Sequence, residues 1–88
     1  MSDKPFSLEI LTPREKVFAG TVTSLIVPGG RGYVGVWANH APFVATLAPG
    51  KVTYRQADGR TSMLWLAGGG ILEVRKNQAV LLADQVVR

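Results

Sequence analysis

Short apolar segments, separated by turns rich in glycine and proline, constrain the fold of this chain more than any other feature. Turn signals recur mostly at intervals of about eight to twelve residues. They occupy residues 12–13, 28–32, 39–42, 48–50, 57–60, 68–70 and 76–77. No window of about eleven residues keeps a helical period without an interrupting glycine or proline, apart from the C-terminal segment. This pattern is typical of an antiparallel β-sandwich or barrel.

The segments between these turns are rich in β-branched and aromatic residues, which favour strands. The predicted strands cover residues 6–11, 16–20, 22–27, 33–37, 43–47, 51–56, 61–66, 70–75 and 78–83. Residues 52–55 (VTYR) alternate between apolar and polar, which predicts one buried and one exposed face. Asp58-Gly59 favours a turn with positive φ and predicts a hairpin over residues 54–63. We interpret residues 78–88 as a last strand followed by a short tail rather than a helix.

Length and composition limit the classes of function. The chain has 88 residues, the size of one small domain, and residues 1–88 are treated as a single domain with little room for a deep substrate cavity. It has no cysteine and one histidine, which excludes a disulfide framework, a thiolate nucleophile and a cysteine-ligated zinc site. The first residues contain no apolar run typical of a secretory signal or a membrane span, which predicts a bacterial cytoplasmic location.

The formal net charge of +4 suits an anionic partner such as nucleic acid or a phospholipid surface. The basic residues are dispersed, however, with no run longer than two, which is more typical of a solvated surface. The aromatic residues fall mostly one to a strand, which favours core filling over a stacking platform. A basic β-barrel that binds nucleic acid is the alternative hypothesis. A sandwich that binds carbohydrate or another small molecule would need Trp37 or Trp65 in a pocket, and we expect both to be mostly buried.

The single histidine, His40, is the most obvious candidate for chemistry. A nucleophilic triad would need a nucleophile on a strained turn and an orienting carboxylate, and neither motif is near it in the sequence. Asn39 tolerates a left-handed backbone, and Pro42 favours an extended conformation at Ala41. We therefore predict a turn or contact residue at His40, with no catalytic, cofactor or metal role. The glycine cluster at residues 28–32 lacks the ending of a phosphate-binding loop and predicts a tight turn.

Several short motifs follow one another in order along the chain. They are Gly32-x-x-Gly35, His40-Ala41-Pro42, Pro49-Gly50, GGILEV at residues 69–74 and LAD at residues 82–84. In this order they resemble the epsilon subunit of F-type ATP synthases, in the β-sandwich domain with which that family begins. The resemblance covers about residues 7–88.

The resemblance implies a sandwich of two five-stranded antiparallel sheets, with about ten short strands. It implies a non-catalytic subunit of the central rotor stalk, without a cofactor, a metal or a small-molecule substrate. The domain is expected to link the gamma subunit to the polar loops of the membrane c-ring and to support the coupling of proton flow to ATP synthesis. The implied location is peripheral, on the cytoplasmic side of the bacterial plasma (inner) membrane, with no nucleic-acid partner.

The same resemblance assigns contact residues. Those expected to face the gamma subunit are Thr12, Asn39, His40, Ala41 and Pro42. Those expected to lie near the c-ring are Gly30, Arg31, Gly32 and Tyr33. Many relatives carry a glutamate at the position of Tyr33, so a carboxylate contact with the c-ring is not expected here.

Relatives usually continue past the segment matching Ala83-Asp84 into two helices that can extend along gamma and restrain ATP hydrolysis. The present sequence ends at Arg88. We therefore expect it to support coupling and assembly, but not to inhibit through such a helical arm.

Overall fold

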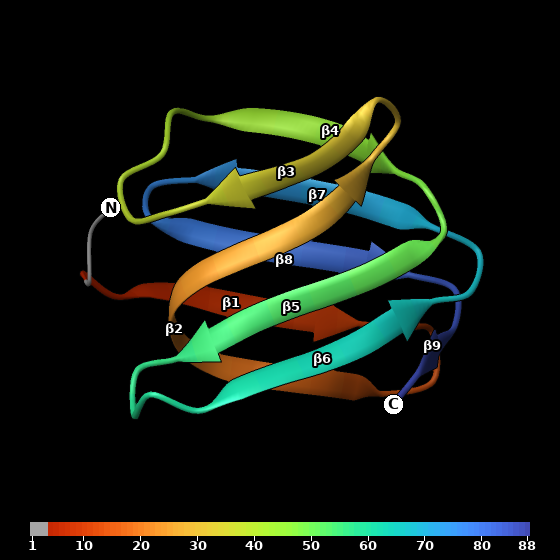
Figure 1. The fold of residues 1–88 in the computed structure, drawn as a ribbon, viewed down its shortest axis with the longest axis horizontal. Coiled ribbons are helices and arrows are strands. Elements are labelled where there is room, and N and C mark those ends of the chain that lie inside the picture. Colours follow the sequence, from red (N-terminus) through yellow and green to blue (C-terminus); the bar gives the residue numbers. More distant parts are fainter. Residues whose placement is uncertain (1–3) are drawn as a thin grey trace.

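Nine β-strands and their turns make up residues 4–88, the part of the chain that the computed structural model describes (Figure 1). The strands are β1 (Phe6–Leu11), β2 (Lys16–Gly29), β3 (Gly32–Val36), β4 (Phe43–Leu47), β5 (Gly50–Gln56), β6 (Thr61–Leu66), β7 (Gly70–Arg75), β8 (Gln78–Ala83) and β9 (Val86–Val87). Within residues 4–88 there is no helix. The predicted all-β class is therefore confirmed, and β1, β4, β6, β7 and β8 have the predicted bounds.

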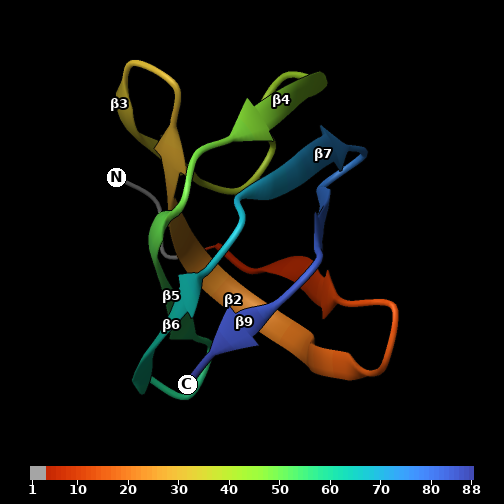
Figure 2. The ribbon, with the colours of Figure 1, turned by 90° about the vertical axis from the view of Figure 1, so that its right-hand side faces the viewer.

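The long strand β2 belongs to both layers of the structure (Figure 2). Its N-terminal half pairs with β1, from Phe6 opposite Val22 to Leu11 opposite Lys16. Its C-terminal half pairs with β3 and β5. The pairing with β5 shifts register between Val22 and Ser24, where the strand passes from one layer to the other. The predicted strands 16–20 and 22–27 are therefore two halves of one strand.

We call the two layers the front sheet and the back sheet, after their places in Figure 1. The front sheet holds β3, the C-terminal half of β2, β5, β6 and β9, and the back sheet holds the N-terminal half of β2, β1, β8, β7 and β4. Each layer thus has five strands when β2 is counted in both, which explains why nine strands form a sandwich expected to contain about ten.

Two details differ from the expected arrangement. β1 and β8 pair in parallel, from Ser7 opposite Gln78 to Leu11 opposite Leu82, so the back sheet is not wholly antiparallel. These strands are distant in the sequence, and no hairpin fixes their relative direction. The predicted tail after β8 also contains a short strand, β9, which extends the front sheet beside Trp65 and Leu66 of β6.

An apolar core fills the space between the sheets. Its largest fully buried side chains include Leu8, Ile10, Leu25, Leu66, Leu72 and Leu81. Among the described residues, no polar or charged side chain is buried. Burial of each large aliphatic side chain contributes about 1.5–3 kcal/mol, so the core holds the two layers in a fixed relation. The alternation predicted for residues 52–55 is confirmed, because Val52 and Tyr54 are buried and Arg55 is exposed.

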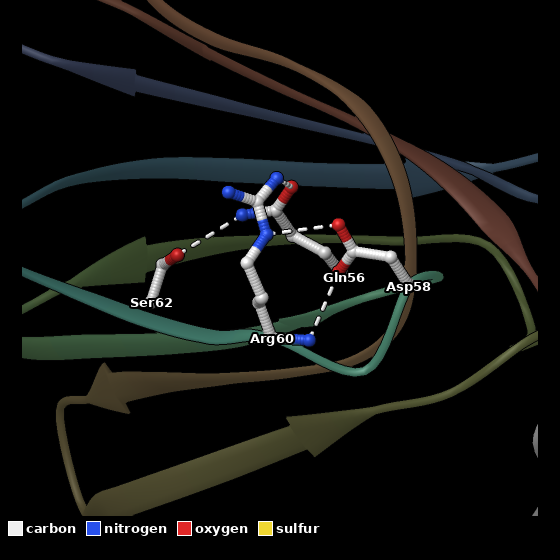
Figure 3. A network of polar contacts seen from close by, with 4 residues as sticks. All are labelled: Gln56, Asp58, Arg60 and Ser62. Carbon is white, nitrogen blue, oxygen red and sulfur yellow. Dashed lines mark hydrogen bonds and ion pairs between the residues drawn. The ribbon is translucent and has the colours of Figure 1, made fainter.

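The predicted hairpin at Asp58-Gly59 is present between β5 and β6 (Figure 3). Gly59 has a φ of 95°, and its N–H donates to the carbonyl oxygen of Gln56 at 2.9 Å. The Asp58 carboxylate accepts hydrogen bonds from the backbone N–H of Arg60 at 2.9 Å and from its Nε at 2.8 Å. Gln56 Nε2 donates to Ser62 Oγ at 3.0 Å. These contacts are internal to the turn and stabilise its shape.

The turns gather at two ends of the sandwich (Figure 1). The long strand β2 begins beside Leu11 and ends beside Leu47 at one end, and it bends back near Val22, opposite Phe6 and Gln56, at the other. We call one the glycine end, with the turns at residues 12–15, 30–31, 48–49, 67–69 and 84–85. The other is the histidine end, with the turns at residues 37–42, 57–60 and 76–77. The longest dimension of the molecule is 30 Å, so loops at the two ends are well separated.

Candidate interaction surfaces

The loop that contains His40 joins β3 to β4 at the histidine end. Asn39 has a φ of 62°, the left-handed backbone that an asparagine tolerates, in the turn predicted at this position. His40 is exposed, its Nδ1–H donates to the carbonyl oxygen of Ala41 at 2.8 Å, and its ring lies 4.8 Å from that of Phe43. In residues 4–88 no cluster of three or more histidine or carboxylate side chains could hold a metal ion. The geometry is that of a surface loop presenting an imidazole.

This loop is fixed to two other segments by Asn77. The N–H of Asn39 donates to Asn77 Oδ1 at 2.8 Å, and Asn77 Nδ2 donates to the carbonyl oxygen of Pro5 at 3.0 Å. Asn77 lies in the β7–β8 turn with a φ of 60°. The loop is therefore held in one conformation before any partner binds, which lowers the entropy cost of binding.

The predicted c-ring residues form the β2–β3 hairpin at the glycine end. Gly29 pairs with Gly32, so Gly30 and Arg31 form the exposed tip. Gly32 has a φ of 131°, a conformation that side chains rarely adopt. The side chain of Tyr33 is 58% exposed, and its hydroxyl oxygen accepts the backbone N–H of Lys51 at 3.2 Å. The hairpin is thus an ordered projection from this end.

Thr12 lies at the glycine end, away from the other four residues predicted to face gamma. Its Oγ1 accepts hydrogen bonds from the N–H groups of Arg14 at 3.3 Å and Glu15 at 3.2 Å, which closes the β1–β2 turn. The structure brings residues 39–42 together at the histidine end, but does not place Thr12 beside them. Both groups instead border the back sheet, one at each end.

The outer surface of the back sheet carries an apolar patch that the sequence analysis did not identify. Its exposed members are Val44 at 68%, Ile71 at 46% and Leu82 at 48%. Ile71 lies opposite Leu82 on one side and Thr46 on the other, and Leu82 lies opposite Leu11. We call Leu11, Val44, Ile71 and Leu82 the apolar back face. Adjacent apolar residues such as Leu81-Leu82 could have revealed it, because neighbours in a strand point to opposite faces.

A groove at the glycine end continues this apolar back face. It has a volume of about 610 Å³ and a mainly apolar lining. The lining residues are Leu11, Thr12, Pro13, Thr46, Leu47, Gly68, Gly69, Gly70, Ile71, Leu82, Ala83 and Asp84. Gly69 has a φ of 77°, and a Cβ there would collide with the carbonyl oxygen of Leu47. The groove therefore depends on glycine at this position.

Trp65 lies on the outer surface of the front sheet, contrary to the expectation that both tryptophans are mostly buried. Trp65 is 51% exposed, so the expectation that it is mostly buried is wrong. Leu64 and Leu66 occupy the inward positions of β6, and strand alternation therefore turns Trp65 outward. Trp37 is only partly buried, and its ring lies over Gly35 on β3.

Among the described titratable groups, Asp58 has a clearly shifted pKa. The backbone N–H of Arg60 holds this pKa below the ordinary value of 3.8, and the Arg60 side chain acts in the same direction. Because the carboxylate is exposed and engaged in its own turn, it does not have the environment of a catalytic acid or base.

The described part of the chain, residues 4–88, contains no helix that could span a bilayer.

Comparison with known proteins extends over almost the whole chain. The family model described as ATP synthase, Delta/Epsilon chain, beta-sandwich domain matches residues 5–88. The chain is 41% identical over 85 residues to the ATP synthase epsilon chain of Chlorobaculum tepidum, covering 97% of this chain and 96% of the relative. It is 37% identical over 84 residues to the ATP synthase epsilon chain of Dichelobacter nodosus, covering 96% of this chain and 58% of the relative. The chain therefore spans nearly all of one relative and little more than half of the other.

Solved structures show the same fold at lower identity. A chain in the Euglena gracilis mitochondrial ATP synthase, resolved as OSCP, F1 and c-ring, has a TM-score of 0.84 at 22% identity, covering 91% of this chain and 51% of that one. A chain in the central stalk and c-ring of the Tetrahymena thermophila mitochondrial ATP synthase has a TM-score of 0.77 at 14% identity, covering 91% and 63%. With the family match over residues 5–88, the chain belongs to the family of ATP synthase delta/epsilon chain β-sandwich domains.

Proposed function

We propose that this protein is a non-catalytic subunit of the central stalk of an ATP synthase, where it links the gamma subunit to the c-ring. Its role is to transmit rotation between them and so to support the coupling of proton flow to ATP synthesis. Family membership and the epsilon-chain relatives support this assignment, and the two solved assemblies with the same fold contain a c-ring. The proposed location is peripheral to the bacterial plasma membrane, on its cytoplasmic side.

The apolar back face is the observation that carries this proposal. Leu11, Leu82 and Ile71 are direct neighbours on one sheet surface, and Val44 lies diagonally beyond Ile71, opposite Glu73. An exposed apolar surface of this kind on a small domain marks an interaction site. Thr12 borders this surface at the glycine end, and residues 39–42 border it at the histidine end. We infer that gamma packs against the apolar back face and touches both borders. If gamma covers the back sheet from one end to the other, it can contact both Thr12 and residues 39–42 although these lie at opposite ends.

The β2–β3 hairpin is the proposed contact with the c-ring. Its tip, with Gly30 and Arg31, projects from the glycine end, where the strands end. The apolar back face lies instead on the outer side of the back sheet. A partner at the strand ends and a partner on the sheet surface can therefore bind at the same time. The rigid core between them gives the domain the stiffness that transmission of torque requires.

The proposal is tested by co-purification of the chain with its gamma subunit. We expect a stable complex with the wild-type protein and its loss with Ile71→Glu, because a carboxylate would be desolvated in the centre of the interface. Val87→Glu is the matched control, since Val87 is a similarly exposed aliphatic residue, at 54%, on the front sheet. If wild-type protein formed no complex with gamma, the proposed function would be wrong. If both variants bound like wild type, the apolar back face would not be the gamma surface.

A further inference from the structure

The outer surface of the front sheet combines exposed aromatic and basic side chains. Lys51 lies opposite Trp65, and Thr53 lies opposite Met63, so these four share neighbouring positions on β5 and β6. Met63 is 60% exposed and Trp65 is 51% exposed. We call Tyr33, Lys51, Arg55, Met63 and Trp65 the basic front face. It lies on the layer opposite to the apolar back face.

The charges of the chain are distributed unequally between the two sheets. The front-sheet segments contain one carboxylate, Asp58, which is already paired with Arg60. The other described carboxylates, Glu9, Glu15, Glu73 and Asp84, lie in the back sheet and its turns. In the described part of the chain, the ion pairs involve Lys16, Arg60 and Arg88. Lys51 and Arg55 are exposed and take part in none of them, so the basic front face is left with positive charge.

We propose that the basic front face binds an acidic segment of another subunit in the assembled ATP synthase, an inference that rests on the proposed function. Carboxylates of that segment pair with Lys51 and Arg55, and an apolar side chain of the segment packs against Met63 and Trp65. Tryptophan, tyrosine, methionine and arginine are the residues enriched in the cores of protein interfaces. Charge complementarity supplies orientation, and the exposed apolar side chains supply contact area.

The arrangement of the side chains favours a protein partner over a lipid surface or a nucleic acid. Lys51 lies directly beside Trp65 on the sheet, so insertion of the indole into a bilayer would carry the ammonium group with it. Nucleic-acid binding draws most of its affinity from many phosphate contacts. Here three cations outside the ion pairs, Arg31, Lys51 and Arg55, lie in the front sheet and its turns, fewer than such a backbone track requires.

Zero-length cross-linking of the purified, intact complex tests this inference. A carbodiimide joins a lysine amine to a carboxylate only when the two are in contact. We expect Lys51 to be joined to an aspartate or glutamate of another subunit, and mass spectrometry identifies that residue. Lys51→Arg keeps the charge but removes the amine, so the cross-link is expected to be lost while the complex still assembles. In hydroxyl-radical footprinting, Met63 and Trp65 are expected to lose reactivity in the complex relative to the isolated chain.

Other outcomes would overturn the inference. If Lys51 formed no cross-link, and Met63 and Trp65 reacted equally in the complex and in the isolated chain, the face would be open to solvent. The isolated chain would then be tested for binding to phosphatidylglycerol vesicles and to a single-stranded oligonucleotide. If it bound either one, and the double variant Lys51→Glu/Arg55→Glu did not, the partner would be lipid or nucleic acid. Absence of gamma from the purified complex would instead refute the proposed function, so the two failures are distinguishable.

Discussion

The side-chain oxygen of Asn77 accepts the backbone N–H of Asn39 at 2.8 Å, across a separation of 38 positions in the chain. Both residues have left-handed backbone, with φ of 60° and 62°. The same side chain donates to the carbonyl oxygen of Pro5 at 3.0 Å. One asparagine thus joins the β7–β8 turn, the loop of His40 and the segment before β1.

Asn77→Gly is expected to lower the free energy of unfolding by about 2 kcal/mol, because two hydrogen bonds of about 1 kcal/mol each are lost while glycine keeps the left-handed backbone. Urea unfolding at neutral pH measures this change. Lys76→Gly is the matched control, since Lys76 also has positive φ, at 49°. We expect a change of about 1 kcal/mol or less in the control. Equal effects of the two substitutions would show that the hydrogen bonds of Asn77 contribute nothing.

His40→Ala is expected to weaken binding to gamma by about tenfold and to leave the free energy of unfolding within about 1 kcal/mol of wild type. The imidazole is exposed, and within residues 4–88 its hydrogen bond and its ring contact are with the neighbouring residues Ala41 and Phe43, so its removal does not open the core. Co-purification with gamma and urea unfolding measure the two quantities. Thr61→Ala, at an exposed position on the front sheet, should change neither. Unfolding of the His40 variant would show that the ring is a structural element rather than a contact.

Local sequence pattern predicted individual strands well, but it did not predict the course of β2. β1 and β8 have the predicted bounds because turn residues flank them on both sides. Gly20 was expected to end a strand, whereas it lies within β2, and a Cβ there would lie 2.9 Å from the Phe18 ring. The parallel pairing of β1 with β8 depends on the packing of distant segments, which a local pattern does not contain.

Among the candidate surfaces too, some features follow from the local sequence and others do not. The turn at residues 39–42 follows from local chemistry, because asparagine tolerates a left-handed backbone and Asn39 adopts one. Ile71 shares its face with Glu73 and Arg75, so alternation along β7 predicts that it points outward. Leu82 lies in the continuous apolar segment 79–83, where residue type alone does not show which members point outward. The expected burial of Trp65 is wrong because strand alternation, and not the apolar character of the residue, determines which side it faces. The inward positions of Leu64 and Leu66 decide the orientation of the indole.

Gly69→Ala is expected to destabilise the fold by more than about 3 kcal/mol, because it adds a collision with the Leu47 carbonyl to the strain of positive φ. Gly59→Ala is the matched control. Gly59 also has positive φ, at 95°, but no atom lies within 4 Å of the place that an added methyl group would take, so only backbone strain of about 1–2 kcal/mol is expected. Thermal or urea unfolding separates the two variants. A loss no larger at Gly69 than at Gly59 would mean that β4 and the β6–β7 turn can move apart at little cost.

Asp58→Asn is expected to change how stability depends on pH. The backbone N–H of Arg60, and then its side chain, hold the folded-state pKa of Asp58 below the ordinary value of 3.8. In acid the unfolded chain therefore binds a proton at Asp58 before the folded chain does, so stability falls as the pH falls through this region. The stabilising contribution of the carboxylate is fully present well above the ordinary pKa and is lost as the pH falls through the folded-state pKa. Asp58→Asn lacks this titration and should be less stable than wild type at about pH 7, with the difference shrinking as the pH falls below the ordinary pKa of 3.8 and through the folded-state pKa.

Urea unfolding of wild type and Asp58→Asn across this pH range measures the effect. Arg60→Ala removes the guanidinium but keeps the backbone N–H that contributes most to the pKa shift, so it should retain part of the pH dependence. Added salt should weaken the part due to the ion pair, which is exposed, more than the part due to the backbone hydrogen bond. A stability difference between wild type and Asp58→Asn that stayed constant from neutral to acid pH would show that the carboxylate acts through shape rather than charge.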